Sequence, residues 1–152
     1  MALMKSIIAG KAVAFDTAPL IYYLEEHPDY LGLTDELFEA IDRREVRGLT
    51  SVLTLLEVMV KPLREGRDAI ANSYRQILNN AANLSLYEMN EAVGVRAARL
   101  RAKYSWLRTP DAIQLATALE HGADIIVTSD ERWKRISELT VLVLKDYLPA
   151  SP

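Results

Sequence analysis

The chain has 152 residues, of which 50% are hydrophobic and 26% charged, a balance typical of one globular domain and not of a disordered chain. Its formal net charge is −3 and its isoelectric point about 5.4, which excludes a protein that binds nucleic acid through overall basic charge. The absence of cysteine excludes disulfides, thiol nucleophiles and zinc–thiolate sites, and agrees with a reducing, cytoplasmic location.

The amino-terminal segment, residues 1–14, superficially resembles a signal peptide. Lys5 precedes a short apolar run, and an A-x-A sequence stands at residues 12–14. Lys11 interrupts the apolar run and leaves it too short for export, so the segment is better interpreted as a strand. No run approaches the roughly eighteen apolar residues of a membrane span, so no association with a membrane is expected.

Strands and helices are predicted to alternate along the chain. The apolar pattern predicts strands at residues 11–15, 46–50, 83–87, 123–128 and 139–144. Helices are predicted at residues 17–26, 34–44, 51–61, 67–80, 90–103 and 109–122, with a short helical turn before the last strand. Expected helix caps are Thr34, Ser51, Asn90 and Thr109. This alternation indicates a single α/β domain, residues 1–152, with a parallel sheet of about five strands and helices on both faces.

Three carboxylates stand where such a sheet binds its ligands, outside the carboxyl ends of the strands, and a fourth can join them. Asp16 ends the first predicted strand, and Asp130 ends the sequence I-I-V-T-S-D. Glu57 lies on the helix that follows the second strand. Asp111 lies in the first turn of the helix T-P-D-A-I-Q-L-A, and it joins the others if that helix packs at the same edge.

Each acid also has an ordinary structural explanation. Asp16 and Asp130 can cap helices, and Asp111 can complement a helix dipole; taken singly, these are the commoner roles. Glu57 is harder to explain, because it lies in the otherwise apolar sequence S-V-L-T-L-L-E-V-M-V-K-P. A salt bridge to Lys61 contributes only about 0.3 kcal/mol, too little to offset burial of a charge.

As a group, the four acids favour a metal site. Carboxylates brought together without a cation repel one another, so the pKa of at least one must rise. Mg²⁺ or Mn²⁺ prefers oxygen ligands of this kind and relieves the repulsion. Such ions activate a water and stabilise the oxygens of an in-line displacement at phosphorus. An acidic site with bound cations can therefore receive a phosphodiester despite the negative net charge.

Four blocks of the sequence resemble the ordered blocks of PIN-domain proteins, and most closely those of VapC-like toxins from bacterial and archaeal toxin–antitoxin pairs. The blocks are F-D-T-A-P-L-I-Y-Y-L-E, T-S-V-L-T-L-L-E-V, T-P-D-A-I-Q-L-A-T-A-L and A-D-I-I-V-T-S-D-E-R-W. The resemblance extends over about residues 13–144. It departs in two conservative ways, since many relatives have Asn in place of Ser129 and Phe in place of Trp133.

The resemblance implies a PIN fold and a metal-dependent nuclease that usually cleaves RNA. It implies that one or two Mg²⁺ or Mn²⁺ ions are held by Asp16, Glu57, Asp111 and Asp130. It assigns a supporting polar role to Thr17 and Thr128. It also implies three partners: an RNA substrate, a second copy of the chain in a homodimer, and a small VapB-like antitoxin. The tail of that antitoxin would cover the site, often with a basic residue that reaches the acids.

Two other functions remain open. One is a PIN nuclease in RNA processing or DNA metabolism without a toxin role. The other is a PIN binding module that does not cleave; degenerate members of that kind usually lose one of the acids, whereas this chain keeps all four.

Basic residues gather on one face of the helix predicted at residues 90–103. They are Arg96, Arg99 and Lys103, with Arg108 a few residues further on. Such a set is usually a solvated helix face. The functional alternative is a rim beside the acids that contacts nucleic-acid phosphates and contributes affinity but little sequence choice.

Overall fold

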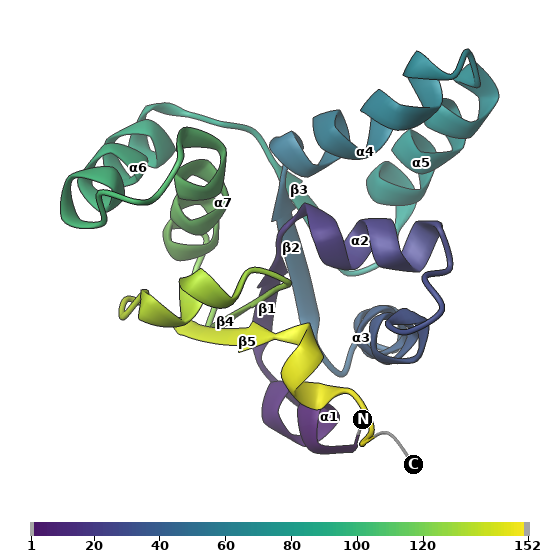
Figure 1. Ribbon diagram of the computed structural model, residues 1–152, viewed down its shortest axis with the longest axis horizontal. Helices are drawn as coiled ribbons and strands as arrows, with labels where there is room; N and C mark the ends of the chain where they lie inside the picture. The colour runs from purple at the N-terminus through teal and green to yellow at the C-terminus, as the bar shows by residue number, and fades with distance from the viewer. Residues whose placement is uncertain (1, 151–152) are drawn as a thin grey trace.

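The computed structural model describes residues 2–150 and contains one five-stranded sheet in which all neighbouring strands are parallel. The strands are β1 (Ala12–Phe15), β2 (Arg47–Ser51), β3 (Leu84–Tyr87), β4 (Ile125–Thr128) and β5 (Thr140–Val143). Their order across the sheet is β3-β2-β1-β4-β5, as can be followed in Figure 1. The predicted α/β class and parallel sheet are therefore confirmed.

Seven α-helices and two short 3₁₀ helices lie within residues 2–150. They are α1 (Ala2–Ile8), α2 (Thr17–Leu24), α3 (Leu31–Asp42), α4 (Val52–Arg64), α5 (Asp68–Asn80), α6 (Glu91–Lys103), α7 (Thr109–Glu120), η1 (Glu131–Arg135) and η2 (Leu144–Tyr147). Figure 1 shows α6 and α7 on one side of the sheet and α2 and α3 on the other. None of the helices in this part of the chain is long and apolar enough to cross a membrane.

The central strands fill two cores, one on each face of the sheet. Val13 and Phe15 of β1 belong to the core beneath α1, α2 and α3. The residue between them, Ala14, belongs to the opposite core, together with Ile126 of β4 and Leu115 of α7. Because successive side chains of a strand point to opposite faces, burial of both sets requires helices on both sides of the sheet. The predicted covering of both faces is therefore confirmed.

The amino-terminal segment differs from the prediction. Residues 2–8 form helix α1, and only Ala12–Phe15 is extended; residue 1 lies outside the described part of the chain. Met4 and Ile8, four residues apart, are both fully buried, so helical spacing buries the apolar residues of this segment. Gly10, with a φ of 73°, lets the chain turn from α1 into β1.

Two of the four predicted helix caps are confirmed. The side chains of Ser51 and Asn90 accept hydrogen bonds from the first turns of α4 and α6, at 3.1 and 3.0 Å. The predictions for the other two are wrong, since Thr109 is the first residue of α7 and Thr34 lies inside α3. The buried Thr34 hydroxyl donates to the backbone carbonyl four residues earlier, at 3.2 Å, and so bonds within its own helix.

The order of the strands reverses direction at the centre of the sheet. From β1 the chain continues to β2 and β3 on one side, and it then returns to β4 and β5 on the other. In open sheets of parallel strands, ligands bind where the direction of winding reverses. Here that point lies between the carboxyl ends of β1 and β4, which pair directly with each other.

Candidate active site

The four acids come from four elements that meet at this edge. Asp16 lies between β1 and α2, and Asp130 lies between β4 and η1. Glu57 lies on α4, and Asp111 lies in the first turn of α7. The negative charges of Glu57, Asp111 and Asp130 all act on the carboxyl group of Asp16. The fold thus brings the four acids to one site, including Asp111, whose place depends on how α7 packs.

Asp16 is the most perturbed of the four acids. Its Oδ2 accepts a hydrogen bond of 2.8 Å from the Thr128 hydroxyl, whereas its Oδ1 is buried and has no hydrogen-bond partner among residues 2–150. Burial, the largest cause, raises the pKa of Asp16 to about 7; the hydrogen bond from Thr128 opposes the rise, and the charges of Asp111, Glu57 and Asp130 add to it. A bound cation would satisfy the unpartnered oxygen and offset the mutual repulsion.

Helix capping explains one of the two acids that follow strands. The side chain of Asp16 makes no capping hydrogen bond to α2, so capping does not account for it. Asp130 does cap η1, because its Oδ1 accepts from the backbone N–H of Arg132 at 2.9 Å. Thr128 links the two acids, since its hydroxyl oxygen also accepts from the backbone N–H of Asp130 at 3.1 Å.

Two of the acids are held by arginines of the same chain. Arg132 donates to both carboxylate oxygens of Asp130, at 3.1 and 2.7 Å, and these hydrogen bonds lower the pKa of Asp130. Arg108 approaches Asp111 to 3.7 Å; burial raises the pKa of Asp111, and the Arg108 charge opposes that rise. Within residues 2–150 no three acids or histidines are already gathered as ligands of one metal ion.

Glu57 does not form the salt bridge that would have explained it structurally. Lys61 instead pairs with Glu25 of the loop after α2, with 3.4 Å between Nζ and Oε1. The Glu57 side chain is partly buried, and it makes no hydrogen bond or ion pair with any other described residue. Its carboxylate is thus available to a ligand at the edge of the sheet.

A buried polar network, which the sequence pattern did not predict, lies beneath the acids. Gln114 Nε2 donates to the hydroxyls of Thr54, at 2.9 Å, and Thr17, at 3.5 Å. The Thr54 hydroxyl is 2.8 Å from that of Thr50, which donates to the backbone carbonyl of Phe15, also at 2.8 Å. All four of these polar side chains are buried. The supporting position predicted for Thr17 is therefore part of a larger network.

This network connects the elements that carry the acids. Gln114 lies one helical turn after Asp111 on α7, and Thr54 lies one turn before Glu57 on α4. Thr17 follows Asp16 directly. The sequence holds one signal of this role, a single polar residue in the apolar run A-I-Q-L-A that follows Asp111.

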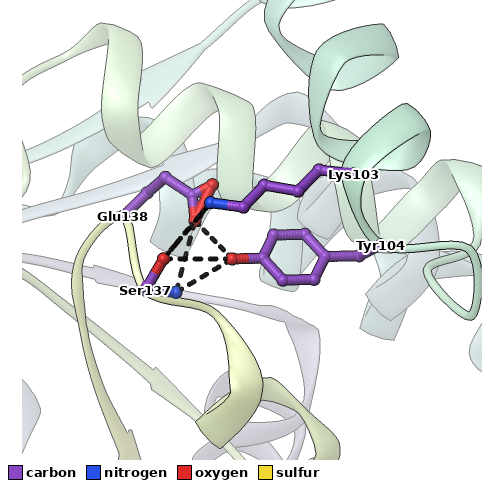
Figure 2. A network of polar contacts seen from close by, with 4 residues as sticks. All are labelled: Lys103, Tyr104, Ser137 and Glu138. Atoms are coloured by element: carbon purple, nitrogen blue, oxygen red, sulfur yellow. Dashed lines mark hydrogen bonds and ion pairs between the residues drawn. The ribbon is translucent and has the colours of Figure 1, made fainter.

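The basic face of α6 is largely neutralised. Arg96 pairs with Glu120 at 2.6 Å, and Lys103 lies 3.5 Å from Glu138. Figure 2 shows Lys103 and Tyr104 converging on Ser137 and Glu138 before β5, where the Tyr104 hydroxyl donates to Glu138 at 2.6 Å. With Arg99, these charged residues line a groove of about 790 Å³. Of the four predicted nucleic-acid contacts, Arg108 is the one paired with an acid of the site.

Fold and site together define an α/β protein with a group of acids at the winding reversal of a parallel sheet. Residues 13–139 match the PIN domain, so the chain belongs to the PIN-domain family. The resemblance inferred from the four sequence blocks is therefore confirmed.

Solved structures with the same fold include chains of toxin–antitoxin assemblies. A toxin–antitoxin complex from Klebsiella pneumoniae contains a chain with 24% identity and a TM-score of 0.67; the match covers 87% of this chain and 97% of that one. A chain of VapBC2 from Rickettsia felis, bound to a DNA fragment from its promoter, has 17% identity and a TM-score of 0.71, with 87% and 98% covered. At these identities the likeness is one of fold. No curated protein matches the chain by sequence.

Proposed function

We propose that the protein is a metal-dependent endonuclease that hydrolyses phosphodiester bonds of RNA. The observation that carries this proposal is the state of Asp16, a carboxyl with one buried, unpartnered oxygen and with three further acids acting on it. A PIN fold supports a nuclease, and PIN nucleases generally use divalent metals. One or two Mg²⁺ or Mn²⁺ ions would be held by Asp16, Glu57, Asp111 and Asp130.

A bound divalent cation supplies Lewis-acid chemistry, which lowers the pKa of an attacking water and stabilises charge on the phosphate oxygens. The residues of the chain position the carboxylates that would hold this cation. Thr128 holds one oxygen of Asp16 and leaves the other for a ligand. The network around Gln114 fixes α2, α4 and α7 relative to one another, and with them the carboxylates of Asp16, Glu57 and Asp111.

The substrate class is tested by incubating the purified chain with labelled tRNA, ribosomal RNA fragments and single-stranded DNA. Each substrate is tested with Mg²⁺, with Mn²⁺ and with EDTA. We expect metal-dependent cleavage of RNA and none in EDTA. Cleavage of DNA alone would redirect the proposal to DNA metabolism, and metal binding without cleavage of any substrate would favour a non-catalytic binding module.

We further propose that this nuclease is a VapC-type toxin that acts in the cytoplasm as a homodimer and is inhibited by a small VapB-like antitoxin. The support is the common fold with chains of toxin–antitoxin and VapBC complexes. Expression of the chain alone should arrest bacterial growth, and Asp16→Ala should abolish the arrest. A nuclease active in vitro that leaves growth unchanged would instead favour a role in RNA processing.

The antitoxin has its own test, because toxin and antitoxin are commonly encoded together. A small open reading frame beside the gene should encode a protein that restores growth and blocks cleavage. Absence of such a neighbour would count against the toxin role while leaving the nuclease in place.

A further inference from the structure

Asp130 and Arg132 form the most complete ion pair at the site. Nε of Arg132 donates to Oδ1 at 3.1 Å, and Nη2 donates to Oδ2 at 2.7 Å. Oδ1 also accepts from the backbone N–H of Arg132 at 2.9 Å. Both oxygens of this carboxylate are therefore occupied by the side chain of a residue only two positions further along. Two-pronged pairs of this kind are among the stronger hydrogen-bonded ion pairs in proteins.

Trp106, in the loop between α6 and α7, also contacts the guanidinium group. The central carbon of the Arg132 guanidinium lies 5.7 Å from the centre of the Trp106 ring, within the range of a cation–π contact. The positive charge of Arg132 also acts on the carboxyl group of Asp111. One guanidinium thus serves as counter-ion for one acid of the site and opposes the rise that burial causes in the pKa of a second, Asp111.

We propose that Arg132 is a built-in competitor of the metal ion: its guanidinium holds Asp130 in the metal-free protein and must release it when a divalent cation takes Asp130 as a ligand. The inference rests on the proposed function, because it assumes that the acids bind cations. Its geometric basis is that both oxygens of Asp130 accept hydrogen bonds from the Arg132 guanidinium.

If Arg132 instead orients Asp130 for the metal ion, the expected change in metal affinity has the opposite sign. If Arg132 served only to orient Asp130 toward the cation, its removal would weaken metal binding. If Arg132 competes for Asp130, its removal frees Oδ2, leaves Oδ1 with only the backbone N–H bond, and strengthens metal binding. The sign of the change in affinity therefore distinguishes competition from orientation.

Arg135 provides a matched control. Its guanidinium lies 5.9 Å from the same Trp106 ring, and it forms no ion pair with any other described residue. Arg135→Ala removes the same charge from the same aromatic ring without touching Asp130. A general electrostatic effect would change metal affinity equally in both variants.

The experiment is calorimetric titration with Mn²⁺ of the wild-type chain, Arg132→Ala and Arg135→Ala, with circular dichroism to verify the fold. We expect Arg132→Ala to lower the Kd for Mn²⁺ about three- to tenfold, as expected for loss of a partly exposed two-pronged ion pair. Arg135→Ala should leave the Kd unchanged, and Arg132→Lys, which keeps the charge but loses the fork, should lie between. A Kd in Arg132→Ala equal to or higher than that of the wild type would contradict competition between Arg132 and the metal ion. An equal decrease in Kd in Arg135→Ala would contradict it as well.

Fluorescence of Trp106 provides a second readout that does not depend on cleavage. Addition of Mg²⁺ should change the Trp106 emission as the guanidinium leaves Asp130, and the change should be absent in Arg132→Ala and in Trp106→Phe. Metal binding by the wild type without this change would contradict release of Arg132 but leave the nuclease proposal standing. If neither the wild type nor Arg132→Ala binds a divalent cation, both proposals fail.

Discussion

The hydroxyl of Thr128 donates to Oδ2 of Asp16 at 2.8 Å, and through this bond the end of β4 holds the acid that follows β1. The same hydroxyl oxygen accepts from the backbone N–H of Asp130 at 3.1 Å. One small side chain therefore places two acids from adjacent strands. It leaves Asp16 Oδ1 as the buried oxygen without a partner among residues 2–150.

Thr128→Val should test this placement, because valine keeps the branched shape and loses only the hydroxyl. We expect a loss of about 1–2 kcal/mol in the free energy of unfolding, since two polar groups lose a buried partner. The hydrogen bond lowers the pKa of Asp16, so its loss should raise that pKa and shift the acid limb of the pH–rate profile upward. Thr128→Ser should restore both properties. An unchanged profile in Thr128→Val would contradict the role given to the hydroxyl.

Stability in EDTA should depend on pH through Asp16. Its pKa is about 7 in the folded chain against 3.8 for an ordinary aspartate, so between these values the folded state keeps a proton that the unfolded state has released. This contribution to stability is complete below about pH 4 and is lost as the pH rises through 7. Asp16→Asn has no proton to lose, so its free energy of unfolding should exceed that of the wild type by about 4 kcal/mol at pH 8 and by little at pH 4.

Urea denaturation of both proteins in EDTA at several pH values measures this difference. Subtracting the two curves removes the titration of the other groups that the proteins share. Two curves that stay parallel from pH 4 to pH 8 would show that the site does not perturb Asp16. Saturating Mn²⁺ should then stabilise the wild type more than Asp16→Asn, because a ligand stabilises the state that binds it.

Much of the fold could be predicted because its signals are local. Strand β4 (Ile125–Thr128) begins with three apolar residues, and Ser51 and Asn90 are polar caps before helices with an apolar face. The first helix could not be predicted, because Met4 and Ile8 bury a helical face only when the rest of the core is present. The cap predicted at Thr34 is wrong because its hydroxyl bonds within α3.

The site could be predicted only in part, because only some of its signals are local. Asp16 and Asp130 follow strands, so topology alone places them at one edge of the sheet. The contacts of Gln114 and Arg132 could not be predicted, since each depends on the side-chain conformation that packing selects. Pairing of Arg132 with Asp130 also changes the expected behaviour of the site, from four free acids to acids with internal counter-ions.

Gln114→Leu should show whether the buried network positions the acids or only stabilises the fold. Leucine fills a similar volume but cannot donate to Thr54 and Thr17, so we expect a loss of about 1–2 kcal/mol in stability. Affinity for Mn²⁺ should also fall, because α7 and α4 lose their link beneath the site. Thr117→Val is the control, since that buried hydroxyl bonds only within α7, to the carbonyl of Ile113. Equal metal affinity in Gln114→Leu and Thr117→Val would contradict a placing role for the network.

RNA binding should involve Arg108 more than the face of α6. Arg96 and Lys103 pair with Glu120 and Glu138, whereas Arg108 pairs with an acid of the site, Asp111, at 3.7 Å and keeps 74% of its side chain exposed. In an Asp16→Ala background, Arg108→Ala should weaken RNA binding and make the dependence of log K on log salt shallower, by about 0.7 for each phosphate that Arg108 neutralises. Arg99→Ala, a basic residue of the α6 groove, is the comparison. A larger effect of Arg99→Ala would place the RNA on α6 instead.

The central claim is that the four acids bind the divalent cation used to cleave RNA. The most direct measurement is the initial rate of RNA cleavage in Mn²⁺ by the wild type, Asp16→Ala, Asp111→Ala and Asp42→Ala. Asp42 is an exposed acid at the end of α3 and serves as the control. We expect Asp16→Ala and Asp111→Ala to lose cleavage while keeping the fold, and Asp42→Ala to match the wild type. A wild-type rate in folded Asp16→Ala or Asp111→Ala would contradict the account.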